Sequence, residues 1–109
     1  MNIFYNYNSE KGRHSLNPML FWEYDLKTLD LQKSRSLVVK RVVELGKSTD
    51  FYACFDLYGG IENVAKIAQD EIIGLSDRNL QFMCDIFHLN KENTLCFKKK
   101  QSRTILLNS

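Results

Sequence analysis

The thiol and imidazole side chains in this sequence, which are the usual ligands of structural zinc, are three cysteines and two histidines. Cys84 and His88 are four residues apart, so they share one face of a helix, and Cys96 follows them. A closed zinc site takes four thiolate or imidazole ligands, and no fourth residue completes this group. We therefore expect no metal or other cofactor, and we interpret the cysteines as small buried side chains of a reducing compartment. A metal-binding module made by these three residues is the third alternative for the function.

Catalytic motifs are missing from the sequence. It contains no H-E-x-x-H helix, no P-loop, no G-x-S-x-G elbow and no Cys-His-Asn grouping. The aspartates are scattered at positions that suit helix caps and solvated faces, and His14 lies in a polar N-terminal stretch. Because no nucleophile accompanies a base, the sequence predicts a protein that is not an enzyme and has no catalytic residues.

Residues 19–26, M-L-F-W-E-Y-D-L, bring large apolar side chains together in one short segment. A lipid-binding surface would interleave cations with these rings, but Glu23 and Asp25 stand there instead. We therefore predict no membrane contact and expect Trp22 to be buried in an aromatic lid over the helices. The residues expected in the lid and in the core beneath it are Phe21, Trp22, Tyr24, Leu57, Tyr58, Leu80 and Phe82.

Apolar periodicity predicts about four main helices with short loops, over residues 31–47, 50–58, 61–72 and 77–89. In the first of them, an arc of apolar side chains extends from Leu31 to Leu45 and faces the core. No alternating pattern long enough for a strand precedes residue 95. The predicted fold class is therefore all-α, a small single-domain bundle with flexible termini.

Cap residues predict where these helices begin and end. Gly46 stands where a left-handed C-cap is wanted after the first helix. Ser76 is expected to cap the fourth helix, and Asn90 a last short turn. His88 is expected to interact with carbonyls at a helix end. The segment Leu95-Cys96-Phe97 is expected to run extended.

Arg35 lies near the start of the first predicted helix, inside its apolar arc. A buried guanidinium requires a carboxylate partner. Glu23 and Asp25, just upstream, are the nearest acids in the aromatic segment. We therefore predict an ion pair between Arg35 and one of these two acids, which would tie the aromatic lid to the first long helix.

Charge is unevenly distributed along the chain, although the net charge is only +2. Residues 27–47 carry six basic side chains and two acidic ones, residues 48–97 carry three and eight, and residues 98–109 carry four basic side chains and no acid. We favour charged faces that complement one another within the fold, and a polyanion-binding surface is the alternative. The residues expected to contact a partner or a polyanion are Lys33, Lys40, Lys98, Lys99, Lys100 and Arg103.

The chain is expected to form one helical domain over residues 18–97. A loosely ordered segment, 1–17, precedes it, and a basic tail, 98–109, follows. The tail is too short to hold a helix by itself, so we predict that it binds a partner or docks on its own domain. The sequence has no signal peptide and no apolar run long enough to span a bilayer, so we expect a cytoplasmic location.

A helix-turn-helix is the alternative binding module. The helices 50–58 and 61–72, joined by Gly59-Gly60, have suitable lengths and a suitable turn. The second helix would read DNA, but its exposed side chains are expected to include three acids and only Lys66. That balance is unfavourable beside phosphates. If DNA is bound, the basic first helix and the tail are the expected contacts.

Several short motifs resemble a known family. Phe21-Trp22-Glu23-Tyr24-Asp25, Arg41–Gly46 and Leu57-Tyr58-Gly59 occur in that order, followed by Leu80 and Phe82. They resemble short uncharacterised bacterial domains with the pattern F-W-x-[YF]-D, R-[VI]-[LV]-E-x-G and L-Y-G. The match spans about residues 19–90, and it departs from the family where a late Phe-Trp pair is Phe82-Met83 here. Members are often encoded beside nucleotidyltransferase toxins of the AbiEii class, which implies an antitoxin role.

These observations predict an all-α protein-interaction module. The resemblance implies an antitoxin that occludes a nucleotidyltransferase-type toxin, and no catalytic residues are carried over from the family. The expected partner is a protein, either the toxin or a second copy of the chain. A small DNA-binding regulator of the helix-turn-helix type is the second alternative.

Overall fold

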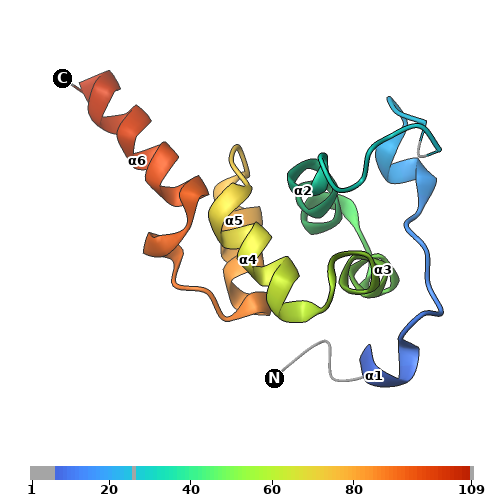
Figure 1. Ribbon diagram of the computed structural model, residues 1–109. Helices are drawn as coiled ribbons and strands as arrows, with labels where there is room; N and C mark the ends of the chain where they lie inside the picture. Colours follow the sequence, from blue (N-terminus) through green and yellow to red (C-terminus); the bar gives the residue numbers. More distant parts are fainter. Residues whose placement is uncertain (1–6, 26, 109) are drawn as a thin grey trace.

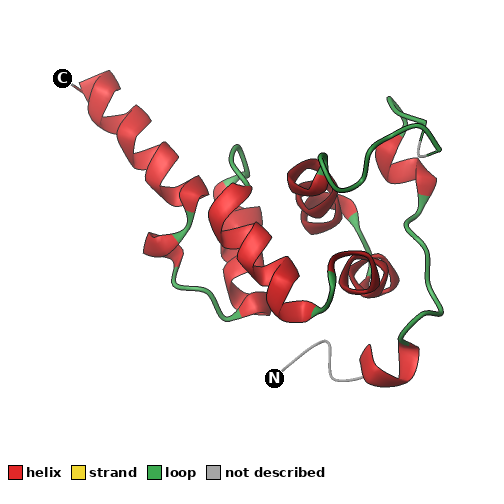
Figure 2. Ribbon diagram, in the orientation of Figure 1, coloured by secondary structure: helices red, strands yellow, loops and turns green. Residues whose placement is uncertain are grey.

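The computed structural model describes residues 7–25 and 27–108, with side chains described at all of these positions except 10 and 103–108. This part of the chain forms helices and loops without a strand, which confirms the all-α class (Figure 2). The long helices are α2 (Arg35–Leu45), α3 (Ser48–Tyr58), α4 (Ile61–Glu71), α5 (Asp77–Phe87) and α6 (Leu95–Asn108). The short ones are α1 (Tyr7–Glu10), η1 (Pro18–Phe21) and η2 (Lys91–Asn93).

Helix α4 lies at the centre of the arrangement. It packs against α2, α3 and α6, while α2 also contacts α3, α5 and η1 (Figure 1). Helix α6 leaves the body of the bundle and points away from it (Figure 1). No helix in the described ranges is long and apolar enough to cross a membrane.

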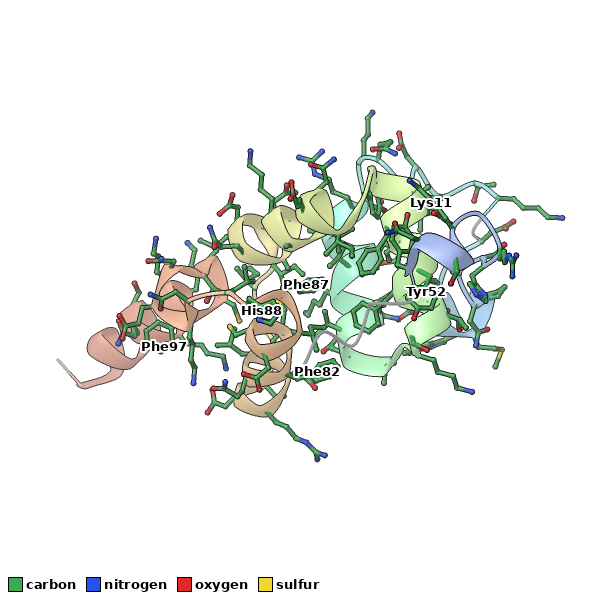
Figure 3. The ribbon with its side chains drawn as sticks, turned by 90° about the horizontal axis from the view of Figure 1, so that it is seen from below. Lys11, Tyr52, Phe82, Phe87, His88 and Phe97 are labelled. Atoms are coloured by element: carbon green, nitrogen blue, oxygen red, sulfur yellow. The ribbon has the colours of Figure 1, made fainter. Side chains whose placement is uncertain are left out.

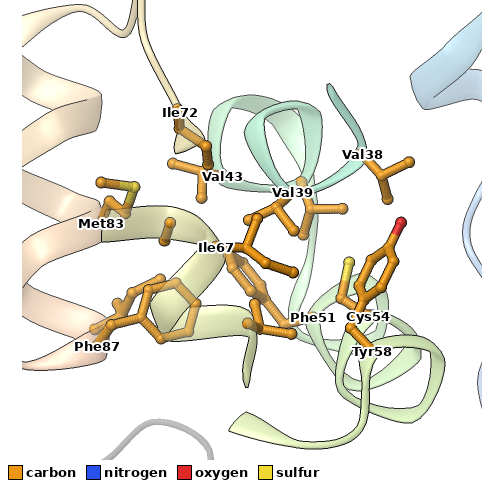
Figure 4. Close-up of a cluster of buried hydrophobic side chains, with 14 of the residues drawn as sticks. Val38, Val39, Val43, Phe51, Cys54, Tyr58, Ile67, Ile72, Met83 and Phe87 are labelled. Atoms are coloured by element: carbon orange, nitrogen blue, oxygen red, sulfur yellow. The ribbon is translucent and has the colours of Figure 1, made fainter. Parts of the chain in front are cut away.

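The core forms where the apolar faces of α2 to α5 meet (Figure 4). Helix α2 contributes four valines, each at most 4% exposed, on its inward side. The rings of Phe51 and Phe55 on α3 meet Phe87 on α5 edge to face, at centroid distances of 6.2 and 6.4 Å. Burial of each such side chain contributes roughly 1.5–3 kcal/mol, so this cluster is the main source of stability. Of the residues expected in the core, Phe21, Tyr58 and Leu80 are buried, and Leu57 packs at its edge.

The expected aromatic lid over residues 19–26 is wrong for its outer half. Leu20 and Phe21 are buried, but Trp22 is 68% exposed and Tyr24 47% exposed; Leu26 lies outside the described residues. The physical reason is the 3₁₀ turn of η1, which directs only one side of the short segment inward. Leu45 was expected in the buried arc and is instead 58% exposed, because α2 ends there.

Phe82, which was also expected in the core, is partly exposed. It is 41% exposed, yet its ring meets Phe51 at a centroid distance of 6.4 Å. Figure 3 shows Phe82 and Phe87 on α5, and Phe51 of α3 contacts both rings. Phe82 therefore closes the edge of the core rather than filling it.

The helix ends match the expected caps in part. Ser76 Oγ accepts a hydrogen bond from the Asn79 amide at 3.1 Å, and Asn90 Oδ1 accepts one from the Glu92 amide at 3.1 Å, as predicted. Gly46 is not left-handed, since its φ is −78°; a Cβ there would lie 2.7 Å from the Val42 carbonyl oxygen. The position requires glycine for close approach rather than for a positive φ. His88 is the left-handed C-cap of α5, with a φ of 55°.

The expected extended segment 95–97 is wrong, because α6 begins at Leu95. Thr94 supplies the N-cap: its Oγ accepts from the Phe97 amide at 3.2 Å and donates to the Lys91 carbonyl at 2.7 Å. Threonine is a preferred N-cap residue, so the sequence does contain a signal for a helix that begins after Thr94. Because α6 runs on to residue 108, the expected boundary at residue 97 falls inside a helix.

The N-terminal segment packs more firmly than expected in its described part. Tyr7 is 6% exposed, and its hydroxyl donates to Asp56 at 2.7 Å, which together with burial raises its pKa to about 12. The Gly12 amide donates to the other Asp56 oxygen at 2.8 Å. Residues 7–17 are therefore tied to α3, while residues 1–6 lie outside the described ranges.

Neighbouring residues 21 and 22 give a matched test of this packing. Phe21→Ala removes a fully buried ring and is expected to lower the free energy of unfolding by ~3–5 kcal/mol. Trp22→Ala, at an exposed position, is expected to lower it by less than ~1 kcal/mol. Urea denaturation followed by circular dichroism measures both values. Equal losses for the two variants would contradict the exposed placement of Trp22.

Candidate protein-interaction surface

Large side chains that the core does not use gather around Arg41 of α2. We name them the aromatic surface, and its members are Met19, Trp22, Tyr24, Arg41 and Leu45. Met19 is 75% exposed and adjoins Leu20, whose carbonyl Arg41 contacts, while Leu45 lies one helical turn beyond Arg41 on the same side of α2. Aromatic residues, methionine and arginine are the types enriched in protein–protein interfaces.

Asp50 places the segment that carries this surface. Its carboxylate is 4% exposed and accepts hydrogen bonds from the Lys47 amide at 2.9 Å and the Asn17 amide at 3.0 Å. The first bond caps α3, where a carboxylate also suits the helix dipole. Asn17 in turn caps η1, because its Oδ1 accepts from the Met19 amide at 3.0 Å. The start of η1 is therefore fixed to the start of α3.

Arg41 holds the other end of the same segment. Its Nη1 donates to the Leu20 carbonyl at 2.8 Å and to Glu23 Oε2 at 3.1 Å, and its Nη2 donates to Glu23 Oε1. The guanidinium carbon also lies 4.7 Å from the centroid of the Trp22 ring. A planar guanidinium can bind a carboxylate with its edge and stack on a ring with its face, which a lysine cannot do. Trp22 is thus oriented while still exposed to solvent.

Electrostatics at this site follow from the same contact. The hydrogen bonds from Arg41 hold the pKa of Glu23 below its ordinary value of 4.5. A carboxyl group whose pKa is lowered on folding stabilises the folded arrangement above its ordinary pKa. This contribution is lost as the pH falls through the lowered value. The aromatic surface is therefore held in place at neutral pH and loosened in acid.

The predicted ion pair of Arg35 is wrong. Arg35 is half exposed, and its Nε donates to both carboxylate oxygens of Glu71 at 2.8 and 3.0 Å. Glu23 is bound by Arg41 instead, and Asp25 accepts a hydrogen bond from the Lys27 amide at 2.9 Å within its own turn. The reason is the direction of α2, whose start lies beside the end of α4 and whose middle lies beside η1.

The lysines expected to contact a partner divide into two groups. Lys40 lies on α2 against the loop between α4 and α5, and Lys99 and Lys100 line a hollow on the other side of that loop. These three lysines therefore lie on the two sides of the same loop. Lys33 and Lys98 are exposed elsewhere, and the side chain of Arg103 lies outside the described residues.

The three thiols are all buried. Burial raises the pKa of Cys54 to about 12 and raises that of Cys84 as well. Cys84 and Cys96 are both buried, whereas His88 is an exposed helix cap. Within the described ranges, no three His, Cys, Asp or Glu residues are grouped so that they could hold a metal ion.

A protein-family model matches part of the chain. Residues 16–68 match the model of a family of unknown function, DUF6922. These 53 of the 109 residues contain η1, α2, α3 and most of α4, and hence the whole aromatic surface. Helices α5 and α6 lie beyond the match. No curated protein and no solved structure matches the chain.

The contact between Arg41 and Trp22 can be tested by measuring the mobility of the Trp22 side chain. Because Trp22 is the only tryptophan, its indole N–H gives a single NMR signal. Arg41→Lys keeps the charge but loses the fork and the stacking, so the heteronuclear NOE of this signal is expected to fall. Acidification of the wild type well below pH 4.5 is expected to lower it too, since protonation of Glu23 removes the same contact. Arg35→Lys is the matched control and is expected to leave the NOE unchanged. An unchanged NOE in Arg41→Lys would contradict the proposed contact.

The burial of the thiols predicts their reactivity. A neutral buried thiol does not attack a disulfide reagent, because the thiolate is the nucleophile. We expect the native protein to release almost no thionitrobenzoate from Ellman's reagent at pH 8, and the unfolded protein to titrate as three thiols. Rapid reaction of one native thiol would show that a cysteine is accessible.

Proposed function

We propose that this chain is a cytoplasmic, non-enzymatic protein-interaction module that binds a partner protein through the aromatic surface. The observation that carries the proposal is Trp22, 68% exposed and yet oriented by Arg41. An exposed indole that is already ordered loses little further freedom on binding, which favours affinity. Tryptophan, tyrosine and arginine are also the residues that most often dominate binding energy at interfaces.

The partner that we propose is a nucleotidyltransferase-type toxin, as the family resemblance implies. In this role the module would be an antitoxin that occludes the toxin by covering part of its surface. The aromatic surface lies within residues 16–68, the part of the chain that matches a family model. The proposed antitoxin role therefore depends on the aromatic surface, which lies within the matched residues.

The second candidate, a helix-turn-helix regulator, has less support. Helices α3 and α4 are joined by Gly59-Gly60, as such a motif would require. However, the exposed side chains of α4 are Glu62, Asn63, Lys66 and Asp70, which are net acidic. Helix α4 also packs against α2, α3 and α6, which leaves little of it to enter a groove.

Co-expression with an AbiEii-class toxin tests the proposal. The wild-type chain is expected to restore growth and to co-purify with the toxin. Trp22→Ala is expected to weaken the complex by about 30-fold or more, the effect of losing a ~2 kcal/mol hot spot. Isothermal titration calorimetry of the purified proteins measures this change.

Arg78→Ala, at an exposed position on α5, is the control variant and is expected to bind normally. Failure of the wild type to bind or neutralise the toxin would reject the antitoxin role. Binding of a duplex DNA with a steep salt dependence, in place of the toxin, would instead favour the regulator.

A further inference from the structure

The loop between α4 and α5 forms a ridge flanked by basic helices. It stands between α2 and α6 in the bundle (Figure 1). On the α6 side a hollow of about 530 Å³ is lined by Ile73, Gly74, Lys99 and Lys100 among others. On the α2 side a smaller hollow of about 160 Å³ is lined by Lys40 and again by Ile73. We name the two hollows and the loop between them the basic groove, and the residues that we assign to it are Lys40, Ile73, Gly74, Lys99 and Lys100.

The loop of the basic groove presents an apolar side chain. Ile73 is 49% exposed between the two hollows, while Leu75 and Cys96, which line the larger hollow, are at most 1% exposed. Covering the exposed part of Ile73 with another apolar side chain would be favourable. A phosphate backbone has no such side chain to offer, so Ile73 favours a protein segment over a nucleic acid.

The rim of the basic groove is positively charged. Its two hollows are lined by three lysines and one acid, Glu71, and that acid is already bound by Arg35 at 2.8 Å. Lys100 is paired with Asp77 at 3.3 Å, a largely exposed contact that a stronger partner could replace at small cost. The rim therefore complements a ligand that carries several carboxylates.

The lysines are positioned by the helices that carry them. The Lys40 ammonium lies so close to Gly74 that a Cβ there would be 3.2 Å from Nζ. On α6, the fully buried Cys96 precedes Lys99 and Lys100 by three and four residues, so one face of the helix carries all three. The Thr94 cap fixes the start of that helix. The charged rim is thus held at both sides of the ridge.

We propose that the basic groove binds an acidic amphipathic segment of a partner protein. An aliphatic or aromatic side chain of that segment packs on Ile73, and its carboxylates pair with Lys40, Lys99 and Lys100. The basic groove is separate from the aromatic surface, because Lys40 contacts the α4–α5 loop whereas Arg41 contacts η1. The proposal therefore does not depend on the toxin as a partner.

An array of fluorescent acidic peptides, each with one to three leucine or phenylalanine positions, tests the proposal with the full chain. Peptides that bind are expected to lose at least about tenfold in affinity to Lys99→Glu and to Ile73→Ser, by fluorescence anisotropy. Lys98→Glu makes the same charge change one residue away, outside the basic groove, and is expected to bind like the wild type. Trp22→Ala is also expected to bind like the wild type.

Four results would overturn the proposal. They are the absence of binding by every peptide, equal binding of polyglutamate, equal losses for Lys98→Glu and Lys99→Glu, and displacement of the peptides by a short DNA duplex at equal concentration. Polyglutamate would show that charge alone is recognised, and the duplex would show that the basic groove binds nucleic acid. Because Ile73 and Lys99 are exposed, thermal unfolding of these variants is expected to match the wild type, and this comparison confirms that each one folds.

Discussion

The buried carboxylate of Asp50 is the contact on which the placement of the aromatic surface depends. Its two oxygens accept from backbone amides of separate segments, one at the start of α3 and one at Asn17. A carboxylate taken out of water in this way must be fully hydrogen-bonded to be tolerated. Its bonds therefore act as a joint between the N-terminal segment and the bundle. Without that joint, the start of η1 would lose its hydrogen-bonded attachment to the start of α3.

Arg41 completes this attachment, and it explains why a large apolar side chain can stay outside the core. Burial of Trp22 would add apolar contact, but Leu20 and Phe21 already occupy the space beneath η1. The guanidinium covers one part of the indole while its edge binds Glu23 and the Leu20 carbonyl. The exposed ring thus has a defined orientation without being buried. That combination is the reason why we propose the aromatic surface as a binding site.

Much of the fold could be predicted from the sequence, because helix periodicity and caps are local signals. Ser76, Asn90 and the apolar stripes of α3 to α5 indicate their elements correctly. The pairing of Arg35 could not be predicted, because it depends on how α2 crosses α4 and not on nearness in sequence. Trp22 was misassigned for a related reason: hydrophobicity indicates that a segment meets the core, but only the turn geometry of η1 decides which side chains enter it. Thr94 is different, since its capping signal is present in the sequence but was not used when the segment after it was expected to run extended.

Helix α2 connects the two surfaces. Successive residues of a helix are about 100° apart, so Lys40 and Arg41 leave α2 on different sides although they are adjacent. The opposite side of α2 carries Val38, Val39, Val42 and Val43, all buried. These valines pack α2 against the core. Because valine is β-branched and has few rotamers, its side chain can adjust little to a shift of the helix. Neither surface therefore requires a rearrangement of the core in order to form. The same packing that gives the bundle its stability fixes Arg41 beneath Trp22 and Lys40 beside Gly74.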